Sequence, residues 1–240
     1  MSLYQDRILP HLVNLAMCNR RLLPYRERVI SAAKGRVLEI GIGSGLNLPF
    51  YPPRVSDLLG LEPAPRLIAM GRRAASRSAP PVKFIEGSAE AIPLEDKSID
   101  TVVTTWTLCT IPDAVGALTE MRRVLKPGGT LLFAEHGTAP DIAVRSWQDR
   151  LTPLWKRIAG GCHLNRKPDD ELRAAGFRID GLETRYIHGW RPFTFMYEGQ
   201  ASTPVHNMIA VSLRRRACQS EQVQRLAAGA RNSSNARPTA

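Results

Sequence analysis

Three alternating glycines follow an acidic residue in the stretch RVLEIGIGSG, residues 36–45. The acid, Glu39, stands two positions before Gly41, and Gly43 and Gly45 complete the alternation. Glycine allows a tight backbone turn and lets a ligand approach more closely than any Cβ would permit. Backbone N–H groups exposed at the end of a strand can cradle a polar, nucleoside-bearing ligand. This stretch therefore predicts a nucleoside-binding loop.

A second acid fits the other end of such a ligand. Glu62 closes the apolar segment 55–61 and lies 17 residues after Gly45, close to the spacing of about 20 expected for an acid that accepts hydrogen bonds from ribose hydroxyls. The dinucleotide fingerprint G-x-G-x-x-G is not met, because Leu46 stands where its third glycine would be. The spacing therefore favours a nucleoside ligand other than a dinucleotide.

His136 is the candidate for acid–base chemistry. It follows the apolar segment 130–134, which predicts a strand, and ligands of open α/β sheets bind outside the carboxyl ends of the strands. A neutral imidazole there can take a proton from a nucleophile near neutral pH. A catalytic base and a hydrogen-bonded structural histidine both fit this pattern.

Alternating strand and helix patterns must position these residues, and they predict an α/β protein. Pro10 and Pro24 are expected helix boundaries within the N-terminal segment. The strands are expected at 36–41, 55–61, 82–85, 101–105 and 130–134, after Phe177, and at Met208 to Leu213, with an aromatic-rich loop at 188–197. The helices are expected at 3–33, 66–77, 114–124, 141–159 and 168–175.

Length and composition indicate one globular domain with additions at its ends. The chain has 240 residues, of which 43% are hydrophobic, and no run of about 18 apolar residues predicts a membrane span. The N-terminus contains acids and prolines, so we expect neither a signal peptide nor an apolar anchor there. We expect residues 1–34 to form a helical lid, 35–216 the main domain and 217–240 a disordered basic tail.

Four scattered cysteines indicate a reducing cytoplasm. Cys18, Cys109, Cys162 and Cys218 form no C-x-x-C pair. Cys162 and His163, taken with His136, match no recognised ligand spacing, so the sequence predicts no metal site.

The net charge of +11 allows attraction to nucleic acid or to an anionic membrane. Part of it lies in the C-terminal tail, so no specific nucleic-acid partner is expected. The basic, amphipathic segment 3–33 fits two roles, a lid over the ligand or a peripheral contact with an anionic membrane.

The motif Glu39-x-Gly41-x-Gly43-x-Gly45 resembles the first motif of class I S-adenosylmethionine-dependent methyltransferases. Further matches follow in the family's order: Glu86-Gly87-Ser88-Ala89-Glu90, Asp100 before a Val-rich strand, and Leu125-Lys126-Pro127-Gly128-Gly129. An ordered set is more specific than any single motif. The resemblance spans roughly residues 20 to 214. It implies a Rossmann-like seven-stranded, mostly parallel sheet with an antiparallel last strand and helices on both faces.

The same resemblance implies S-adenosyl-L-methionine as cofactor. In the family the first acid orients the glycine loop and the amino-acid end of the cofactor, and the fourth strand ends beside the transferred methyl. The position usually acidic in the adenine segment is Ser88. The implied cofactor-binding residues are Glu39, Gly41, Gly43, Gly45, Asn47, Glu62, Pro63, Ser88, Ala89, Glu90, Thr105, Trp106 and Leu108.

Two segments narrow the resemblance to a branch. Phe-Ala-Glu-His at 133–136 and Gly-Cys-His-Leu-Asn-Arg at 161–166 look like the methyltransferase-like group that includes animal alkyl thiol methyltransferases, within the ubiquinone/menaquinone type. This implies a small-molecule methyl acceptor, first a thiol or other small lipophilic compound. The alternatives are a phospholipid amine such as phosphatidylethanolamine and a quinone or phenol. A non-catalytic cofactor-binding protein, suggested by Ser88, and an RNA methyltransferase, suggested by charge, also stay open.

Overall fold

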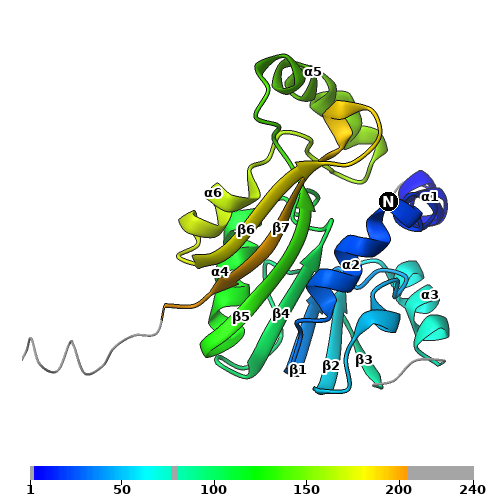
Figure 1. Cartoon of the computed structure of the whole chain (residues 1–240). Coiled ribbons are helices and arrows are strands. Elements are labelled where there is room, and N and C mark those ends of the chain that lie inside the picture. The colour runs from blue at the N-terminus through cyan, green and yellow to red at the C-terminus, as the bar shows by residue number, and fades with distance from the viewer. Residues whose placement is uncertain (1–2, 77–80, 205–240) are drawn as a thin grey trace, which may run out of the picture. The chain divides into compact units, whose positions relative to one another are not determined.

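A computed structural model describes residues 3–76 and 81–204, all within one compact unit, Met1–Pro204. Seven strands form a single sheet in the order β3-β2-β1-β4-β5-β7-β6 (Figure 1). The strands are β1 (Gly35–Ile40), β2 (Val55–Glu62), β3 (Val82–Glu86), β4 (Ile99–Thr105), β5 (Leu125–His136), β6 (Arg178–Tyr186) and β7 (Phe195–Ser202).

Strands β1 to β5 pair in parallel, whereas β7 runs antiparallel to both β5 and β6. The expected Rossmann-like, mostly parallel sheet with an antiparallel last strand is therefore confirmed. The order reverses direction at β1, whose neighbours are β2 and β4. A ligand site is expected outside the carboxyl ends of the strands at such a switch point.

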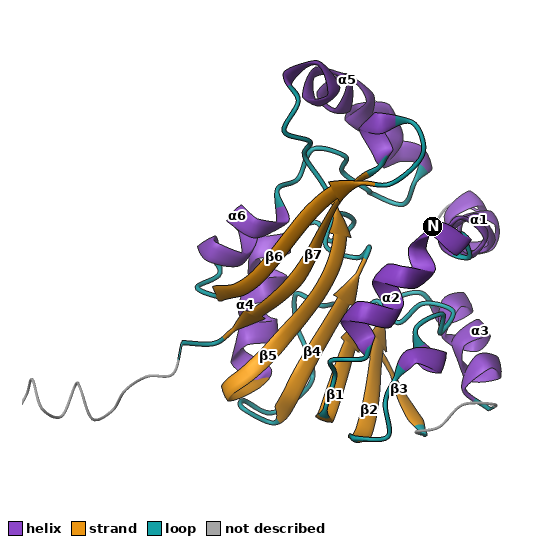
Figure 2. Ribbon diagram, in the orientation of Figure 1, coloured by secondary structure: helices purple, strands orange, loops and turns teal. Residues whose placement is uncertain are grey.

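Helices cover both faces of the sheet (Figure 2), as the family resemblance implied. Because successive side chains of a strand point to opposite faces, Leu38 joins one core and Val37 the other. The first core includes α4 and α6, and the second includes α2. The helices are α1 (Leu9–Met17), α2 (Leu23–Ile30), α3 (Pro65–Ala75), α4 (Ala114–Val124), α5 (Ile142–Ile158) and α6 (Pro168–Ala174), with short turns η1 (Tyr4–Ile8), η2 (Arg20–Leu22), η3 (Leu48–Phe50) and η4 (Arg191–Phe193).

The two N-terminal prolines act as the sequence predicts. Pro10 stands in the first turn of α1 and Pro24 in the first turn of α2, where the missing N–H leaves no intrahelical bond unmade. The expected helical segment 3–33 is therefore divided at these points. No helix among the described residues is long and apolar enough to cross a membrane.

The C-terminal part of the sheet differs from the prediction. The strand expected at Met208 to Leu213 lies outside the described residues, as does the expected tail at 217–240. The strand that follows β6 is instead β7, which begins at Phe195, inside the aromatic-rich segment expected to be a loop. Phe195 and Tyr197 are buried together in the core, so their aromatic character reflects a strand packed between β5 and β6.

Candidate active site

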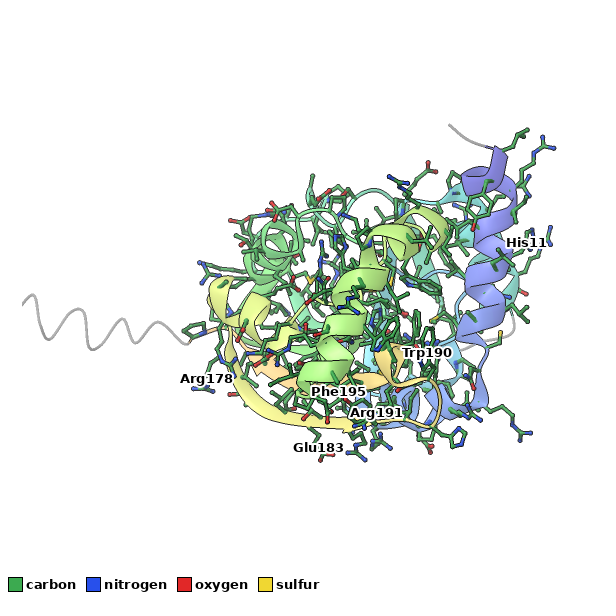
Figure 3. The ribbon with its side chains drawn as sticks, turned by 90° about the horizontal axis from the view of Figure 1, so that it is seen from above. His11, Arg178, Glu183, Trp190, Arg191 and Phe195 are labelled. Atoms are coloured by element: carbon green, nitrogen blue, oxygen red, sulfur yellow. The ribbon has the colours of Figure 1, made fainter. Side chains whose placement is uncertain are left out.

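A cavity of about 340 Å³ lies at the carboxyl ends of β1, β2 and β4. Seen from above, α1 and α5 lie over this end of the sheet (Figure 3). Part of the wall comes from α1, through Leu9, Val13 and Met17, and part from Ala159 and Gly160 after α5. The predicted site residues that line the cavity are Glu39, Gly41, Gly43, Asn47, Glu62, Pro63, Ser88, Ala89, Thr105 and Trp106.

The glycine loop needs its glycines for different reasons. Gly41 has φ +65°, and a Cβ on it would lie 2.5 Å from the Thr107 hydroxyl. Gly43 has φ +56° and faces open space, where the nearest atom to an added Cβ is a backbone oxygen at 3.8 Å. Gly45 does not line the cavity; a Cβ there would contact Leu48. Gly43 is thus the glycine that leaves room for a ligand.

Glu39 is the buried acid at the end of β1. Its side chain is 1% exposed and accepts hydrogen bonds from Asn47 Nδ2 at 2.7 Å and the Tyr51 hydroxyl at 2.8 Å. Burial raises the pKa of Glu39 to about 7, although the bonds from Tyr51 and Asn47 act in the opposite direction. Near neutral pH this carboxyl is therefore ready to ionise when a cation pairs with it.

Arg26 is a site residue that the sequence did not reveal. It is buried, donates to Asn47 Oδ1 and to the Met17 carbonyl, and holds its guanidinium 4.8 Å from the Trp106 ring centroid. In the sequence it counts as one of many basic charges in segment 3–33. Its position three and four residues before Val29 and Ile30, on the apolar side of the helix, is the signal that distinguishes it.

Glu62 occupies the end of β2, as predicted. Its two carboxylate oxygens accept from the backbone N–H groups of Gly43, at 3.1 Å, and Ala64, at 3.0 Å. Burial raises the pKa of Glu62, and these two hydrogen bonds lower it in part. The Gly43 bond ties the second acid directly to the glycine loop.

The segment expected beside the adenine divides into two parts. Ser88 and Ala89 line the cavity, but Glu90 does not. The Glu90 carboxylate accepts from the Ser88 hydroxyl at 3.1 Å and from the Asp113 N–H at 2.8 Å. Glu90 therefore ties this loop to the start of α4.

Strand β4 ends in an unusual backbone conformation. Trp106 has φ +51°, a value rare for a bulky residue and a mark of functional sites when the surroundings enforce it. Its N–H donates to the Ala134 carbonyl at 2.9 Å, and the residue lines the cavity together with Thr105. Leu108, by contrast, is fully buried in the core and does not line the cavity.

Glu135, which the sequence analysis did not single out, supports this turn from behind. It is fully buried and accepts from the Thr104 hydroxyl at 2.9 Å and from the N–H groups of Thr107 and Leu108 at 3.1 and 3.3 Å. Burial raises the pKa of Glu135 to about 7. Its hydrogen bonds fix the backbone of the loop whose Trp106 and Thr107 line the cavity.

His136 does not line the cavity. Its Nε2 lies 3.1 Å from Cys162 Sγ, and Cys109 joins them, so that the three ligand atoms lie within 4.8 Å of one another. Hydrogen bonding with Cys109 and then with His136 lowers the pKa of Cys162, against the effect of burial. The role of His136 as a base stays a prediction.

Comparison with known proteins identifies the family to which the chain belongs. The family model described as "Methyltransferase domain" matches residues 38–133. The chain is 36% identical over 173 residues to human "Thiol S-methyltransferase TMT1B", covering 66% of this chain and 70% of that protein. The chain belongs to the class I S-adenosylmethionine-dependent methyltransferases.

Other relatives of this methyltransferase differ in how much they share with it. The rat TMT1B protein is 36% identical over 165 residues, 67% of this chain but only 65% of that protein's own length. "Phosphatidylethanolamine N-methyltransferase" of Cereibacter sphaeroides is 32% identical over 109 residues, 45% of this chain and 53% of that protein. A solved methyltransferase from Thermotoga maritima shares the fold, with TM-score 0.60, 22% identity and coverage of 82% of this chain and 98% of that one.

The cavity suits the family's cofactor. S-adenosylmethionine combines an ammonium group with a ribose, and this methyltransferase offers a buried carboxyl at the end of β1 and another at the end of β2. Gly43 leaves open the space that a Cβ would fill. Glu39 and Glu62 are acceptors of the kind that ammonium and hydroxyl donors require. Both the acceptor groups and the space beside Gly43 therefore fit the cofactor.

Proposed function

We propose that this methyltransferase transfers the methyl group of S-adenosylmethionine to a small lipophilic thiol. The observation that carries the proposal is the composition of the cavity. Polar groups gather at the glycine loop, while the wall from α1 and from Ile111 and Pro112 is mostly apolar. An apolar wall beside a few placed polar groups suits a small lipophilic ligand. The 36% identity to proteins named thiol S-methyltransferases supports the same acceptor.

The residues around the cavity divide the work of binding. Glu39, held by Asn47 and Tyr51, would pair with the cofactor's ammonium, and Glu62 would accept from its ribose hydroxyls. Ser88 and Ala89 would contact the adenine, and Thr105 and Trp106 the methionine portion. When bound, S-adenosylmethionine supplies a methyl group on a positively charged sulfur, and the acceptor would attack the methyl carbon in line with the carbon–sulfur bond that breaks.

Positioning and exclusion of water would account for most of the rate acceleration. The thiol of free cysteine has an unperturbed pKa of ~8.5, so a small fraction of a thiol of this acidity is already the reactive thiolate at neutral pH. Leu9, Val13 and Met17 of α1 line the cavity, and Asn14 accepts a hydrogen bond from Ser44 in the glycine loop at 2.5 Å. Helix α1 would thus act as the lid that removes water.

Turnover of radiolabelled S-adenosylmethionine by the purified chain tests the proposal. One assay contains a small alkyl thiol, and a parallel assay contains phosphatidylethanolamine vesicles. We expect transfer to the thiol, and much slower transfer by Glu39→Gln when the cofactor concentration does not saturate that variant. Transfer to the lipid alone would contradict the thiol assignment, and failure to bind the cofactor would contradict the site itself.

A second candidate function, N-methylation of a phospholipid at a membrane surface, is favoured by one surface feature. Large apolar side chains are exposed on α1 and α5, including Leu15, which is 72% exposed, and Ile142, which is 80% exposed. Trp190 is exposed before η4; it is labelled in Figure 3 on the face that carries α5 and α1. Basic residues accompany them in η1 and at the end of α5. Such a face would suit peripheral contact with an anionic membrane.

Sedimentation with anionic and neutral vesicles tests this contact. Leu12→Glu with Leu15→Glu should abolish binding to anionic vesicles. Val115→Glu, an exposed apolar position on α4, serves as control and should leave binding unchanged. Equal loss in both variants, or no binding by the unmodified chain, would contradict the membrane role.

A further inference from the structure

Three side chains that can bind a metal converge beside the cavity wall. Cys109 follows β4, His136 ends β5, and Cys162 lies between α5 and α6. Their ligand atoms all lie within 4.8 Å of one another, and both cysteines are buried, with Cys162 9% exposed. Among the side chains that the structure describes, no other group of three or more His, Cys, Asp or Glu is arranged to hold a metal ion.

We propose that Cys109, His136 and Cys162 bind a Zn²⁺ ion. Two thiolates and an imidazole are a donor set that zinc prefers, and three protein ligands leave the fourth tetrahedral position open. Each cysteine releases its thiol proton to solvent as its sulfur binds the metal.

The backbone around the ligands is already held in place. The His163 N–H donates to the Cys109 carbonyl at 2.8 Å. Arg166 donates to the carbonyls of Leu108 and Ile111. These bonds join the segment after α5 to the loop after β4 independently of any metal. The ligands therefore meet without rearrangement of the chain, which reduces the entropy lost on binding.

The location gives the metal a structural consequence for the active site. Thr110 and Ile111 follow Cys109 in the chain, Ala159 and Gly160 precede Cys162, and all four line the cavity. An ion bound to Cys109 and Cys162 would clamp together the two segments that form this wall. This clamp would form whichever acceptor the methyltransferase uses.

Cobalt titration of the reduced, metal-free full chain tests the proposal. We expect one equivalent of Co²⁺ to produce thiolate-to-cobalt charge-transfer absorption and intense tetrahedral d–d bands, and one equivalent of Zn²⁺ to displace it. Cys162→Ser and His136→Ala should each weaken binding at least tenfold. Cys18→Ser, which changes an exposed cysteine, is the matched control and should keep the full signal.

Two further measurements make the result decisive. Zn²⁺ should raise the melting temperature of the unmodified chain but not of Cys162→Ser, while circular dichroism confirms that the variant is folded. Because Cys218 lies outside the described residues, the titration is repeated in Cys218→Ser, where the signal should persist. Absence of the charge-transfer band, a band unaffected by Cys162→Ser, or a Cys109–Cys162 disulfide in place of metal binding would overturn the proposal.

Discussion

Two buried glutamates lie near the ends of strands in the sheet and have different surroundings. Glu39 is the last residue but one of β1, and Glu135 the last but one of β5. Each is at most 1% exposed, and burial raises the pKa of each to about 7. By burial and pKa alone the two carboxyls cannot be distinguished.

Their hydrogen-bond partners separate them. Glu39 is held by the side chains of Asn47 and Tyr51 and lines the cavity. Glu135 is held by the Thr104 hydroxyl and by two backbone N–H groups of the loop after β4. It does not line the cavity, and its Oε2 is buried without a partner. A perturbed carboxyl is therefore a guide to function only together with what it contacts. We interpret Glu39 as a binding residue and Glu135 as a positioning residue.

The largest expected effect is on stability, in Glu135→Ala. The substitution leaves the N–H groups of Thr107 and Leu108 and the Thr104 hydroxyl without their acceptor, and each unsatisfied buried group costs roughly 1–3 kcal/mol. We expect the free energy of unfolding in urea to fall by about 3 kcal/mol. Glu135→Gln, which keeps an acceptor oxygen, should lose less than half as much. The measurements are made with a chelator present, so that metal binding does not contribute. Equal losses in the two variants would contradict the positioning role.

Cofactor affinity, in contrast to stability, should depend on Glu39 and hardly on Glu135. Glu39→Gln removes the charge proposed to pair with an ammonium group, and a hydrogen bond to a charged group contributes about 1.5–3 kcal/mol. Calorimetric titration should therefore show S-adenosylmethionine bound about 30-fold more weakly. Glu135→Gln is the matched control, because it changes an equally buried carboxyl, and its effect should stay within about threefold. Similar losses in both would remove the distinction between the two glutamates.

Sequence reasoning was successful where signals are local. The strands and the glycine turn follow from short periodic patterns, and the predicted acids at the ends of β1 and β2 both line the cavity. Glu135 could not be predicted in the same way, because its partners lie at the end of β4 and in the loop after it, and its role depends on tertiary contact. Strand β7 was not predicted, because aromatic residues suit a buried strand and an apolar loop equally well.

The cluster of Cys109, His136 and Cys162 could not be predicted from the sequence either, because it also depends on tertiary contacts. Metal-site patterns in a sequence rely on ligands at short, fixed spacings, whereas these ligands come from three separate segments, after β4, at the end of β5 and between α5 and α6. Arg26 shows a related difficulty. Its charge predicts exposure, but the hydrogen bond to Asn47 and the contact with Trp106 place it inside the site.

The pH dependence of cofactor binding should follow Glu39. Its pKa is raised to about 7, so the ionised fraction rises about eightfold between pH 6 and 7.5. Affinity for S-adenosylmethionine should increase by about the same factor over this range and become nearly flat in Glu39→Gln. The stability of the unliganded protein should change with pH in the opposite direction. A neutral buried carboxyl favours the unliganded folded state at low pH, and this contribution is lost as the pH rises from about 4.5 to about 7. An affinity that falls over this range would exclude an ionised Glu39 at the site.

The smallest expected effect distinguishes a glycine that leaves room for the cofactor from one that only relieves backbone strain in a turn. Gly43 and Gly128 both have positive φ, +56° and +76°, and an added Cβ would meet no close neighbour at either position. Alanine in this conformation costs about 1 kcal/mol, so Gly43→Ala and Gly128→Ala should lower the free energy of unfolding by similar amounts. Only Gly43 lines the cavity, so only Gly43→Ala should also weaken S-adenosylmethionine binding, by several-fold in a calorimetric titration. If both variants retain full affinity, the cofactor does not occupy the space beside Gly43. The assignment of Glu39 as a binding carboxyl would then depend on the Glu39→Gln result alone.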